Sequence, residues 1–250
     1  GAVAYFELEY LQLSENSHLK NLTLMHGMLG FVISLLLVFR TNTAYDRWWE
    51  GRKHWGALTN ISRNFAIKLN QYLKEPSEKE HFKMMIINYA IALKNHLREN
   101  EDYHELDPVL DISPDRHTPN QVAAAMYRQL QRLYESGALS GEQLIVLDKE
   151  AAAFTDICGA CERIKNTPIP YSHSTFLKKF IFLFVVTLPL GWVFSLGYYV
   201  VPVVIFVMYA FASLELIAEE IENPFGTDAN DLPIDSICQN IRKHVGEILA

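Results

Sequence analysis

Acidic residues gather where the last long apolar stretch of the sequence gives way to charge. They are Glu215, Glu219, Glu220, Glu222, Asp228 and Asp231. Pro224 disfavours a helical conformation at Asn223, so a helix entering this segment should end there, with glutamates in its final turns. Carboxylates at a helix C-terminus oppose the helix dipole and repel one another. The segment therefore predicts compensation, either by basic side chains such as Arg47 or Arg52 or by a hard cation such as Ca2+, held by carboxylate and carbonyl oxygens.

A second cluster combines positive charge with aromatic rings directly after an earlier apolar run. Its members are Arg40, Arg47, Trp48, Trp49, Arg52, Lys53 and Trp55. Tryptophan favours the boundary between lipid and water, and arginine can stack on its ring. The pattern is typical of a belt that anchors a helix at a membrane surface.

Residues that could perform catalysis do not form a recognised pattern. The sequence has no His-Glu-x-x-His, no Gly-x-Ser-x-Gly and no phosphate-binding loop, and its nine histidines are scattered without zinc-ligand spacing. His26 lies within an apolar run, where an ionisable group is either functional or a neutral, hydrogen-bonded side chain between helices. Cys158 and Cys161 are three residues apart in a helical pattern, which favours core packing, and no disulfide framework is implied.

Two long uncharged runs indicate a membrane protein. Residues 21–39 and 180–214 contain no Asp, Glu, Lys or Arg, and runs of about 18 such residues are typical of membrane spans. The second run would form a helix of about 50 Å, longer than the ~30 Å hydrocarbon core, so it should fold into a hairpin. Gly197 and Pro202 predict the turn, because glycine breaks a helix and proline suits the first turn of the next one. Pro189 should kink the first arm.

Basic residues at the ends of these runs predict the orientation. Arg40 and Arg47 follow the first run, and Lys178 and Lys179 precede the hairpin, so the region between them should face the cytoplasm. This region shows helical periodicity without strand alternation. Predicted helices cover residues 40–73, 76–98, 119–134 and 140–165, with a loop at 100–119. Ser140 should cap the last of these helices in a capping box with Gln143.

The expected fold is therefore an all-α membrane protein with four transmembrane helices per subunit, continuing into a helical cytoplasmic domain. Residues 1–6 resemble the tail of a truncated first span, and residues 7–20 should then face outward. The expected domains are 1–39, containing the end of the first span, the outer loop and the second span; 40–179, the cytoplasmic domain; 180–222, the transmembrane hairpin; and 223–250, the acidic turn with a C-terminal helix.

The helix predicted at 21–39 has two distinct faces. At 100° per residue, a bulky stripe falls within one sector of about 80°. It comprises Leu24, Met28, Phe31, Leu35 and Phe39. Gly27, Gly30 and Ser34 form a separate face, where small side chains permit close approach of another helix. The bulky stripe therefore contacts either lipid or a central lumen, in which it could gate ions by dewetting.

Three separated motifs resemble the bacterial branch of the bestrophins. They are the segment from Arg40 to Arg52, the Thr167-Pro-Ile-Pro170 turn, and the segment from Glu220 to Asp231. The likeness spans roughly residues 20–240, in order. It implies a homopentameric ion channel with one central pore. It also implies a neck lined by Phe31, Leu35 and Phe39, and a cytosolic aperture at Glu142 or, one turn away, at Ile145.

Animal members of that family hold Ca2+ in a clasp that follows the last span. The matching side chains here are Glu220, Asn223, Asp228 and Asp231. This sequence departs from the family pattern, because Glu220 replaces an amide and Ala229 and Asn230 thin the acidic run. Ca2+ is thus the one cofactor that the resemblance suggests.

The expected function is passive conduction of monovalent ions through an apolar neck in the bacterial inner membrane. The expected partners are further copies of the chain in a homopentamer, membrane lipid and the ions themselves; a net charge of −7 argues against nucleic acid. A ring of Glu142 carboxylates would favour cations, whereas animal bestrophins conduct chloride, which is the alternative. A rival hypothesis is a membrane-embedded metal-binding or enzymatic module that uses the acidic loop 219–231.

Overall fold

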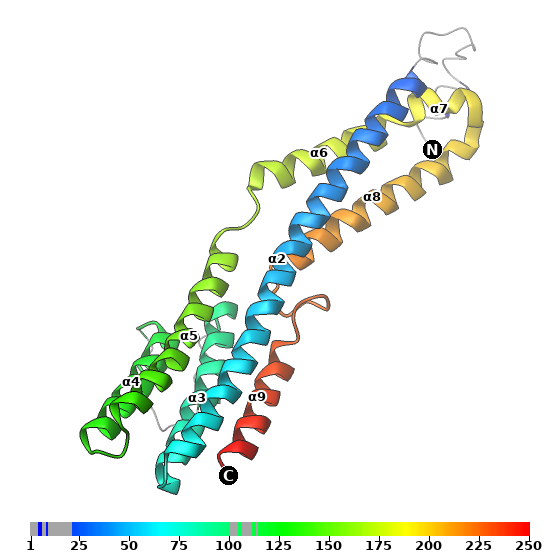
Figure 1. Cartoon of the computed structure of the whole chain (residues 1–250). Helices are drawn as coiled ribbons and strands as arrows, with labels where there is room; N and C mark the ends of the chain where they lie inside the picture. Colours follow the sequence, from blue (N-terminus) through cyan, green and yellow to red (C-terminus); the bar gives the residue numbers. More distant parts are fainter. Residues whose placement is uncertain (1–4, 7–8, 10–21, 101–104, 107–111, 114) are drawn as a thin grey trace. The chain divides into compact units, whose positions relative to one another are not determined.

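The structure is a computed structural model, all-helical across the residues it describes (Figure 1). It describes residues 5–6, 9, 22–100, 105–106, 112–113 and 115–250. The chain divides into two compact units. The first comprises Gly1–Arg47 and Pro168–Glu222, and the second comprises Trp48–Thr167 and Asn223–Ala250. The all-α prediction is confirmed, while most of the predicted span end at 1–6, the outer loop at 7–20 and much of the loop at 100–119 lie outside the described residues.

Helix α2, Leu22–Tyr72, is 51 residues long and contributes to both units. At 1.5 Å per residue it is about 76 Å long, more than twice the hydrocarbon thickness of a bilayer. The prediction that the first uncharged run continues as helix beyond Arg40 is confirmed. The predicted neck residues Phe31, Leu35 and Phe39 therefore lie on the same helix as the cluster of arginines and tryptophans at residues 40–55, called here the Arg-Trp-Trp cluster.

The first unit packs the start of α2 against a helical hairpin. The hairpin comprises α6, Tyr171–Thr187; α7, Pro189–Leu196; a turn of 3-10 helix, η4, Gly197–Tyr199; and α8, Val200–Glu222. Gly197 has a φ of +52°, a conformation that glycine adopts without strain, so the turn falls where the sequence predicts it. The shared core includes Ile33 and Leu37 from α2 and Ile181 and Phe184 from α6.

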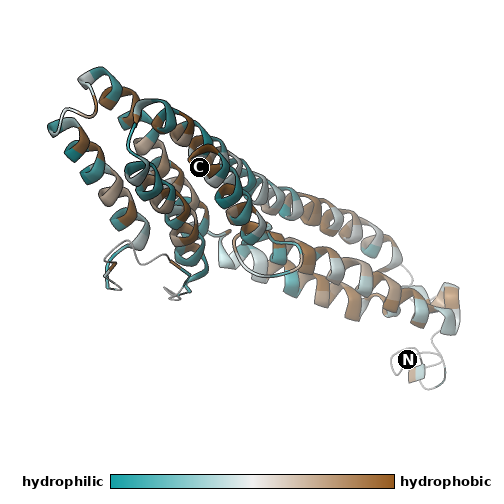
Figure 2. Cartoon of the chain, turned by 90° about the horizontal axis from the view of Figure 1, so that it is seen from below, coloured by the Kyte–Doolittle hydropathy of each residue, from teal (hydrophilic) through white to brown (hydrophobic). Residues whose placement is uncertain are grey.

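Two stretches of helix, Leu22–Tyr72 and Tyr171–Glu222, contain segments long and apolar enough to cross a membrane. Only 17% and 11% of these segments are buried within the protein, so they are not core helices of a water-soluble fold. Hydrophobic residues dominate the helices of the first unit, whereas hydrophilic residues alternate with them in the second (Figure 2). The exposed apolar surface of the first unit is that of a membrane protein.

The second unit is a bundle around one large core. Its helices are the end of α2; α3, Pro76–Arg98; α4, Thr118–Glu135; α5, Gly141–Asn166; and α9, Ile234–Ile248. The predicted capping box is present at the start of α5, where the Ser140 side chain accepts from the Gln143 N–H and the Gln143 side chain accepts from the Ser140 N–H. Trp55, Phe65, Phe82 and Phe154 are fully buried in the core. Ring contacts of Phe65 with Phe82 and Phe154 join α2, α3 and α5 in this core.

Candidate functional site

The predicted neck residues lie on the face of α2 that points away from its own protomer. Phe31, Leu35 and Phe39 are 71%, 45% and 57% exposed, although they are bulky and apolar. Ile33 and Leu37, on the opposite face, are 0% and 2% exposed. The hairpin therefore covers one side of α2 and leaves the stripe uncovered.

The small-residue face of α2 packs within the protomer at one position. A Cβ atom on Gly30 would lie 3.3 Å from the Phe184 ring, so α6 approaches α2 closely there. A Cβ on Gly27 would have no neighbour within 4 Å among the described residues, and Ser34 is exposed. Among the described residues, this face of α2 makes a close contact with the protomer at Gly30.

His26 is a buried, hydrogen-bonded side chain between α2 and α6. Its Nδ1 lies 2.8 Å from the Leu22 carbonyl oxygen, which can only accept, so Nδ1 donates. Its Nε2 lies 3.1 Å from the Thr187 hydroxyl, and its ring meets Phe184 edge-on at 5.7 Å. These contacts agree with the alternative that His26 is a structural, hydrogen-bonded side chain between helices.

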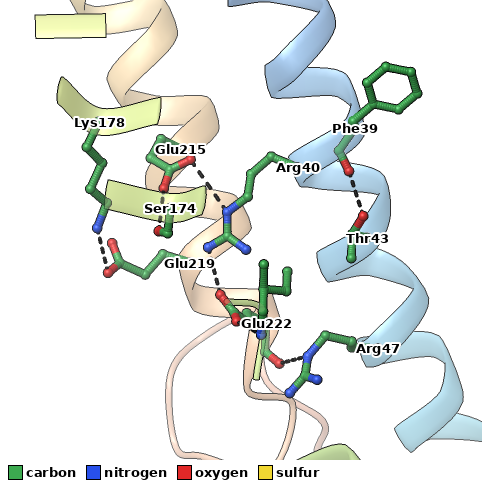
Figure 3. Close-up of polar contacts among 10 residues, drawn as sticks. Phe39, Arg40, Thr43, Arg47, Ser174, Lys178, Glu215, Glu219 and Glu222 are labelled. Carbon is green, nitrogen blue, oxygen red and sulfur yellow. Dashed lines mark hydrogen bonds and ion pairs between the residues drawn. The ribbon is translucent and has the colours of Figure 1, made fainter. Parts of the chain in front are cut away.

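An ion-pair network joins α2 to α8 at one end of the hairpin (Figure 3). The Arg40 side chain is 1% exposed and donates from Nη2 to Glu222 Oε2 at 2.7 Å. Its Nε lies 3.7 Å from Glu215 Oε2, which is an ion pair without a hydrogen bond. A buried arginine between two carboxylates fixes the relative position of the two helices in this unit.

Glu222 is the centre of this network. Its backbone carbonyl accepts a hydrogen bond from Arg47 Nε at 2.9 Å, and its Oε1 accepts from the Ile169 N–H at 2.8 Å. Ile169 belongs to the Thr-Pro-Ile-Pro turn that the sequence singled out. One residue therefore connects α2, α8 and the turn before α6.

The other glutamates of α8 also have polar partners. Glu219 pairs with Lys178 of α6 at 2.8 Å, and Glu215 accepts a hydrogen bond from the Ser174 hydroxyl at 3.4 Å. Figure 3 shows these contacts beside those of Arg40. The negative charges of Glu219 and Glu222, which oppose the dipole of α8, are thus compensated by the basic side chains of Lys178 and Arg40.

The acidic turn after Pro224 is a tight structure within the second unit. Asp231 Oδ2 accepts a hydrogen bond from the Asp228 N–H at 2.7 Å, and the Leu232 N–H donates to the Pro224 carbonyl at 3.0 Å. A Cβ on Gly226 would lie 2.6 Å from Asp231 Oδ2, so a larger residue there would displace the Asp231 carboxylate. The turn therefore brings Asp228 and Asp231 together.

The remaining two clasp residues differ in their surroundings. Asn223 is exposed beside the turn, with its Nδ2 3.9 Å from the position of a Cβ on Gly226. Glu220 is an exposed residue of α8 in the first unit. Calcium binding by the four residues stays a prediction.

Within the second unit, Trp48 and Gly51 of α2 pack against the acidic turn. Trp48 Nε1 donates to the Asn230 carbonyl at 3.0 Å, and a Cβ on Gly51 would lie 3.1 Å from the Phe225 ring. Trp55 is fully buried in the core of the second unit. The expectation of an interfacial belt is therefore wrong for Trp55, because the ring fills a protein core instead of facing lipid.

Both aperture candidates lie at the start of α5 and are exposed. Ile145 is 72% exposed, and Glu142 accepts a hydrogen bond from the Ser140 hydroxyl at 2.7 Å. This hydrogen bond lowers the pKa of the Glu142 carboxyl, which keeps it ionised. The side chains are available to line a pathway outside their own protomer.

Known proteins resemble the chain along most of its length. A voltage-dependent anion channel-forming protein of Nostoc sp. is 38% identical over 88% of this chain and 75% of its own length. One of Escherichia coli is 31% identical over 86% of this chain and 73% of its own length. A crystal structure of a mutated bacterial Bestrophin homologue from Klebsiella pneumoniae matches with a TM-score of 0.84 and 29% identity, covering 90% of this chain and 86% of that one. A crystal structure titled as a membrane protein matches with a TM-score of 0.90 and 28% identity, covering 99% and 94%.

These findings and the exposed apolar helices define a helical membrane protein of the ion-channel class. Its sequence matches, over residues 2–247, the family described as Bacterial/Fungal Bestrophin protein, and the chain belongs to this family. Members of the family are ion channels and not enzymes, so the prediction of a channel is confirmed over that of an enzymatic module.

Proposed function

We propose that the chain assembles as a homopentamer around one pore and conducts monovalent ions passively through a neck of Phe31, Leu35 and Phe39. The observation that supports this most strongly is the exposure of these three side chains on one face of α2. Residues four apart on a helix differ by 40° in direction, so all three point into a common sector. Five copies facing one axis would form three stacked apolar rings.

Apolar rings impede ions by disfavouring the water that hydrates them. A narrow apolar constriction loses its water readily, and an ion that crosses it gives up part of its hydration. Such a neck resists flow of either sign of charge. Discrimination between cations and anions therefore comes from charged residues outside the neck.

We infer that the channel selects cations, through a ring of Glu142 at the aperture. The carboxylate is exposed and its pKa is lowered by the Ser140 hydroxyl, so five negative charges would face a permeating ion. Anions are the second candidate, since the relatives in Nostoc and Escherichia coli bear the name of anion channel-forming proteins.

The proposed location is the bacterial inner membrane, with lipid around the first unit and the second unit in the cytoplasm. Arg40, Arg47, Lys178 and Lys179 flank the apolar helices on the side expected to face the cytoplasm. The exposed rings of Phe182, Phe206 and Tyr209 on the hairpin are suited to contact acyl chains.

Purified protein in liposomes tests this function. Flux of monovalent ions without any other protein is expected, and its absence from a confirmed pentamer would overturn the channel. Reversal potentials in asymmetric sodium chloride give the selectivity, and a value near the sodium equilibrium potential is expected. A value near that of chloride contradicts the cation assignment.

A pair of matched variants locates the filter. Glu142→Gln should shift the reversal potential toward chloride, because it removes five charges from the aperture. Glu135→Gln, an exposed glutamate at the end of α4, serves as the control and should leave the potential unchanged. Equal potentials in both variants would remove Glu142 from the filter.

A further inference from the structure

Two histidines and a glutamate from three separate segments of the second unit converge on one point. His96 lies in the last turn of α3, His117 directly precedes α4, and Glu162 lies in α5. His96 Nε2 is 2.7 Å from Glu162 Oε1, and His117 Nε2 is 2.6 Å from the same oxygen. The three donor atoms all lie within 4.8 Å of one another.

Solvent reaches the cluster through an adjoining cavity. The cavity has a volume of about 390 Å³, and all three side chains line it. They are 32%, 30% and 29% exposed for His96, His117 and Glu162, respectively, so they are held by the fold but remain open to ions from water. The three side chains are therefore accessible from the solvent in this cavity.

The donor set and its geometry suit a metal ion. Imidazole nitrogen and carboxylate oxygen together are ligands that divalent transition metals such as Zn2+ accept. The two rings are inclined by 59° with centroids 4.3 Å apart, and both direct Nε2 at one carboxylate oxygen. Among the described residues, this is the group of His, Cys, Asp and Glu side chains whose spacing could hold a metal.

We propose that His96, His117 and Glu162 form a binding site for one divalent transition-metal ion of the Zn2+ class. The ion displaces the two Nε2–H···Oε1 hydrogen bonds: each neutral ring moves its proton from Nε2 to Nδ1, and the nitrogen and oxygen atoms separate from 2.7 and 2.6 Å to the wider spacing of ligands about 2.0–2.1 Å from the ion. Three protein ligands leave a coordination position free for water from the cavity. The metal joins α3, the start of α4 and α5, and this site is independent of the proposed ion pathway.

The charge of the site is compatible with a cation. Glu162 accepts a hydrogen bond from each histidine on the same oxygen, so the site offers a carboxylate ligand beside two imidazoles. The other charged side chains in the cavity wall are Glu99, paired with Lys165 at 2.9 Å, and Arg116. Glu99, Lys165 and Arg116 together carry one net positive charge, which the Glu162 carboxylate balances.

Metal binding by His117 breaks a hydrogen bond that this side chain now makes. Its Nδ1 now accepts a hydrogen bond from the Asn120 N–H at 3.2 Å, which caps α4 and leaves the proton of a neutral ring on Nε2. A metal on Nε2 moves that proton to Nδ1 and breaks the cap. Loss of one such hydrogen bond lowers the affinity about tenfold, which a two-histidine site for Zn2+ can sustain.

Zinc titration of the full chain in detergent tests the proposal. Calorimetry with Zn2+ is expected to show one tight site per chain, and Co2+ at the same site should give the visible absorption of a low-coordinate complex. The variants are His96→Gln, which keeps an N–H donor for Glu162, and His117→Asn, which keeps an N-cap side chain. Each should weaken zinc binding at least about tenfold.

His244→Gln is the matched control, because His244 is a half-exposed histidine of α9 outside the cluster. It should bind Zn2+ as the wild type does. Circular dichroism and the assembly state of each variant establish that it is folded. Unchanged zinc affinity in a folded His96→Gln/His117→Asn double variant, or no tight zinc site in the wild type, would overturn the proposal.

Discussion

At the scale of single residues, Arg40 is the most informative side chain, because its position in the sequence does not reveal its role. Its place beside Trp48 and Trp49 indicates a surface belt, yet it is 1% exposed between Glu215 and Glu222. Its partners are distant in sequence, so neither periodicity nor spacing could reveal the pairing. The proposed metal cluster was missed for the same reason, because His96, His117 and Glu162 come from three segments and match no local motif.

Replacing Arg40 should destabilise the protein strongly. Arg40→Gln leaves two carboxylates without their buried cation, and removal of one partner of such a pair costs about 3–5 kcal/mol. The control Lys178→Gln breaks the exposed pair with Glu219, which is 50% exposed, and should cost less than about 1 kcal/mol. Thermal unfolding in detergent compares the two, and equal effects would show that the Arg40 network contributes no more than a surface pair.

The ion pairs of Asp235 predict a pH dependence in the second unit. Burial raises the pKa of Asp235, but Arg98 and Lys94, the latter also paired with Glu105, lower it below its ordinary value of 3.8. A lowered pKa in the folded state means that this stabilisation is present above pH 3.8 and is lost as pH falls through the folded value. The gap in melting temperature between wild type and Asp235→Asn should therefore be constant near neutral pH and shrink below about pH 4.

A variant of Arg98, the partner of Asp235, tests whether their ion pair causes this pH dependence. Arg98→Gln should reduce the effect of Asp235→Asn, since the two mutations remove one shared interaction. Additive effects of the two mutations at pH 7 would argue against the ion pair as the origin.

At the scale of elements, local signals predicted most helices well. Proline at residue 76 starts α3, the capping box starts α5, and Gly197 ends α7 as expected. These features depend on neighbours in sequence, which is why sequence alone reveals them. The packing faces were predicted less well: α2 buries His26, Ile33 and Leu37, and only the edge of its small-residue face meets α6. Which face of α2 is buried depends on where the hairpin packs against it, and that contact joins residues distant in sequence.

The neck stripe on α2 is expected to limit conduction. Alanine at Phe31, Leu35 and Phe39 together should raise single-channel conductance, because smaller side chains widen and wet the constriction. The control replaces Phe182, Phe206 and Tyr209, which are exposed on the hairpin and expected to face lipid, and should leave conductance unchanged. Unaltered current in an assembled neck variant would assign the stripe to lipid.

The acidic turn gives a calcium prediction. If Ca2+ binds there, millimolar calcium should raise the melting temperature by mass action, and Asp228→Asn with Asp231→Asn should abolish that rise. Glu247→Gln on α9 is the control and should retain it. Identical melting temperatures in calcium and in chelator would leave the turn as a structure held by its own hydrogen bonds and by Trp48.

At the scale of the whole molecule, assembly decides whether the exposed apolar surface forms a pore. Native mass measurement of the detergent-solubilised protein should give five times the chain mass of 28.7 kDa. A homopentamer with cyclic symmetry places five equivalent stripes around one axis. A monomer as the sole species would leave no shared axis and would contradict the proposed pathway.

The Arg40–Glu222 bond also constrains the order of events during synthesis. The two residues are separated by 182 positions, so at 5–20 residues per second the ribosome adds Glu222 roughly 10–40 s after Arg40. The segment Trp48–Thr167, most of the second unit, emerges in that interval and can begin to pack first. Until Glu215 and Glu222 are added, the nascent chain lacks both carboxylates that pair with Arg40. The first unit is therefore completed by its last residue, and a chain truncated before Glu222 lacks the hydrogen bond that holds the end of α8 to Arg40.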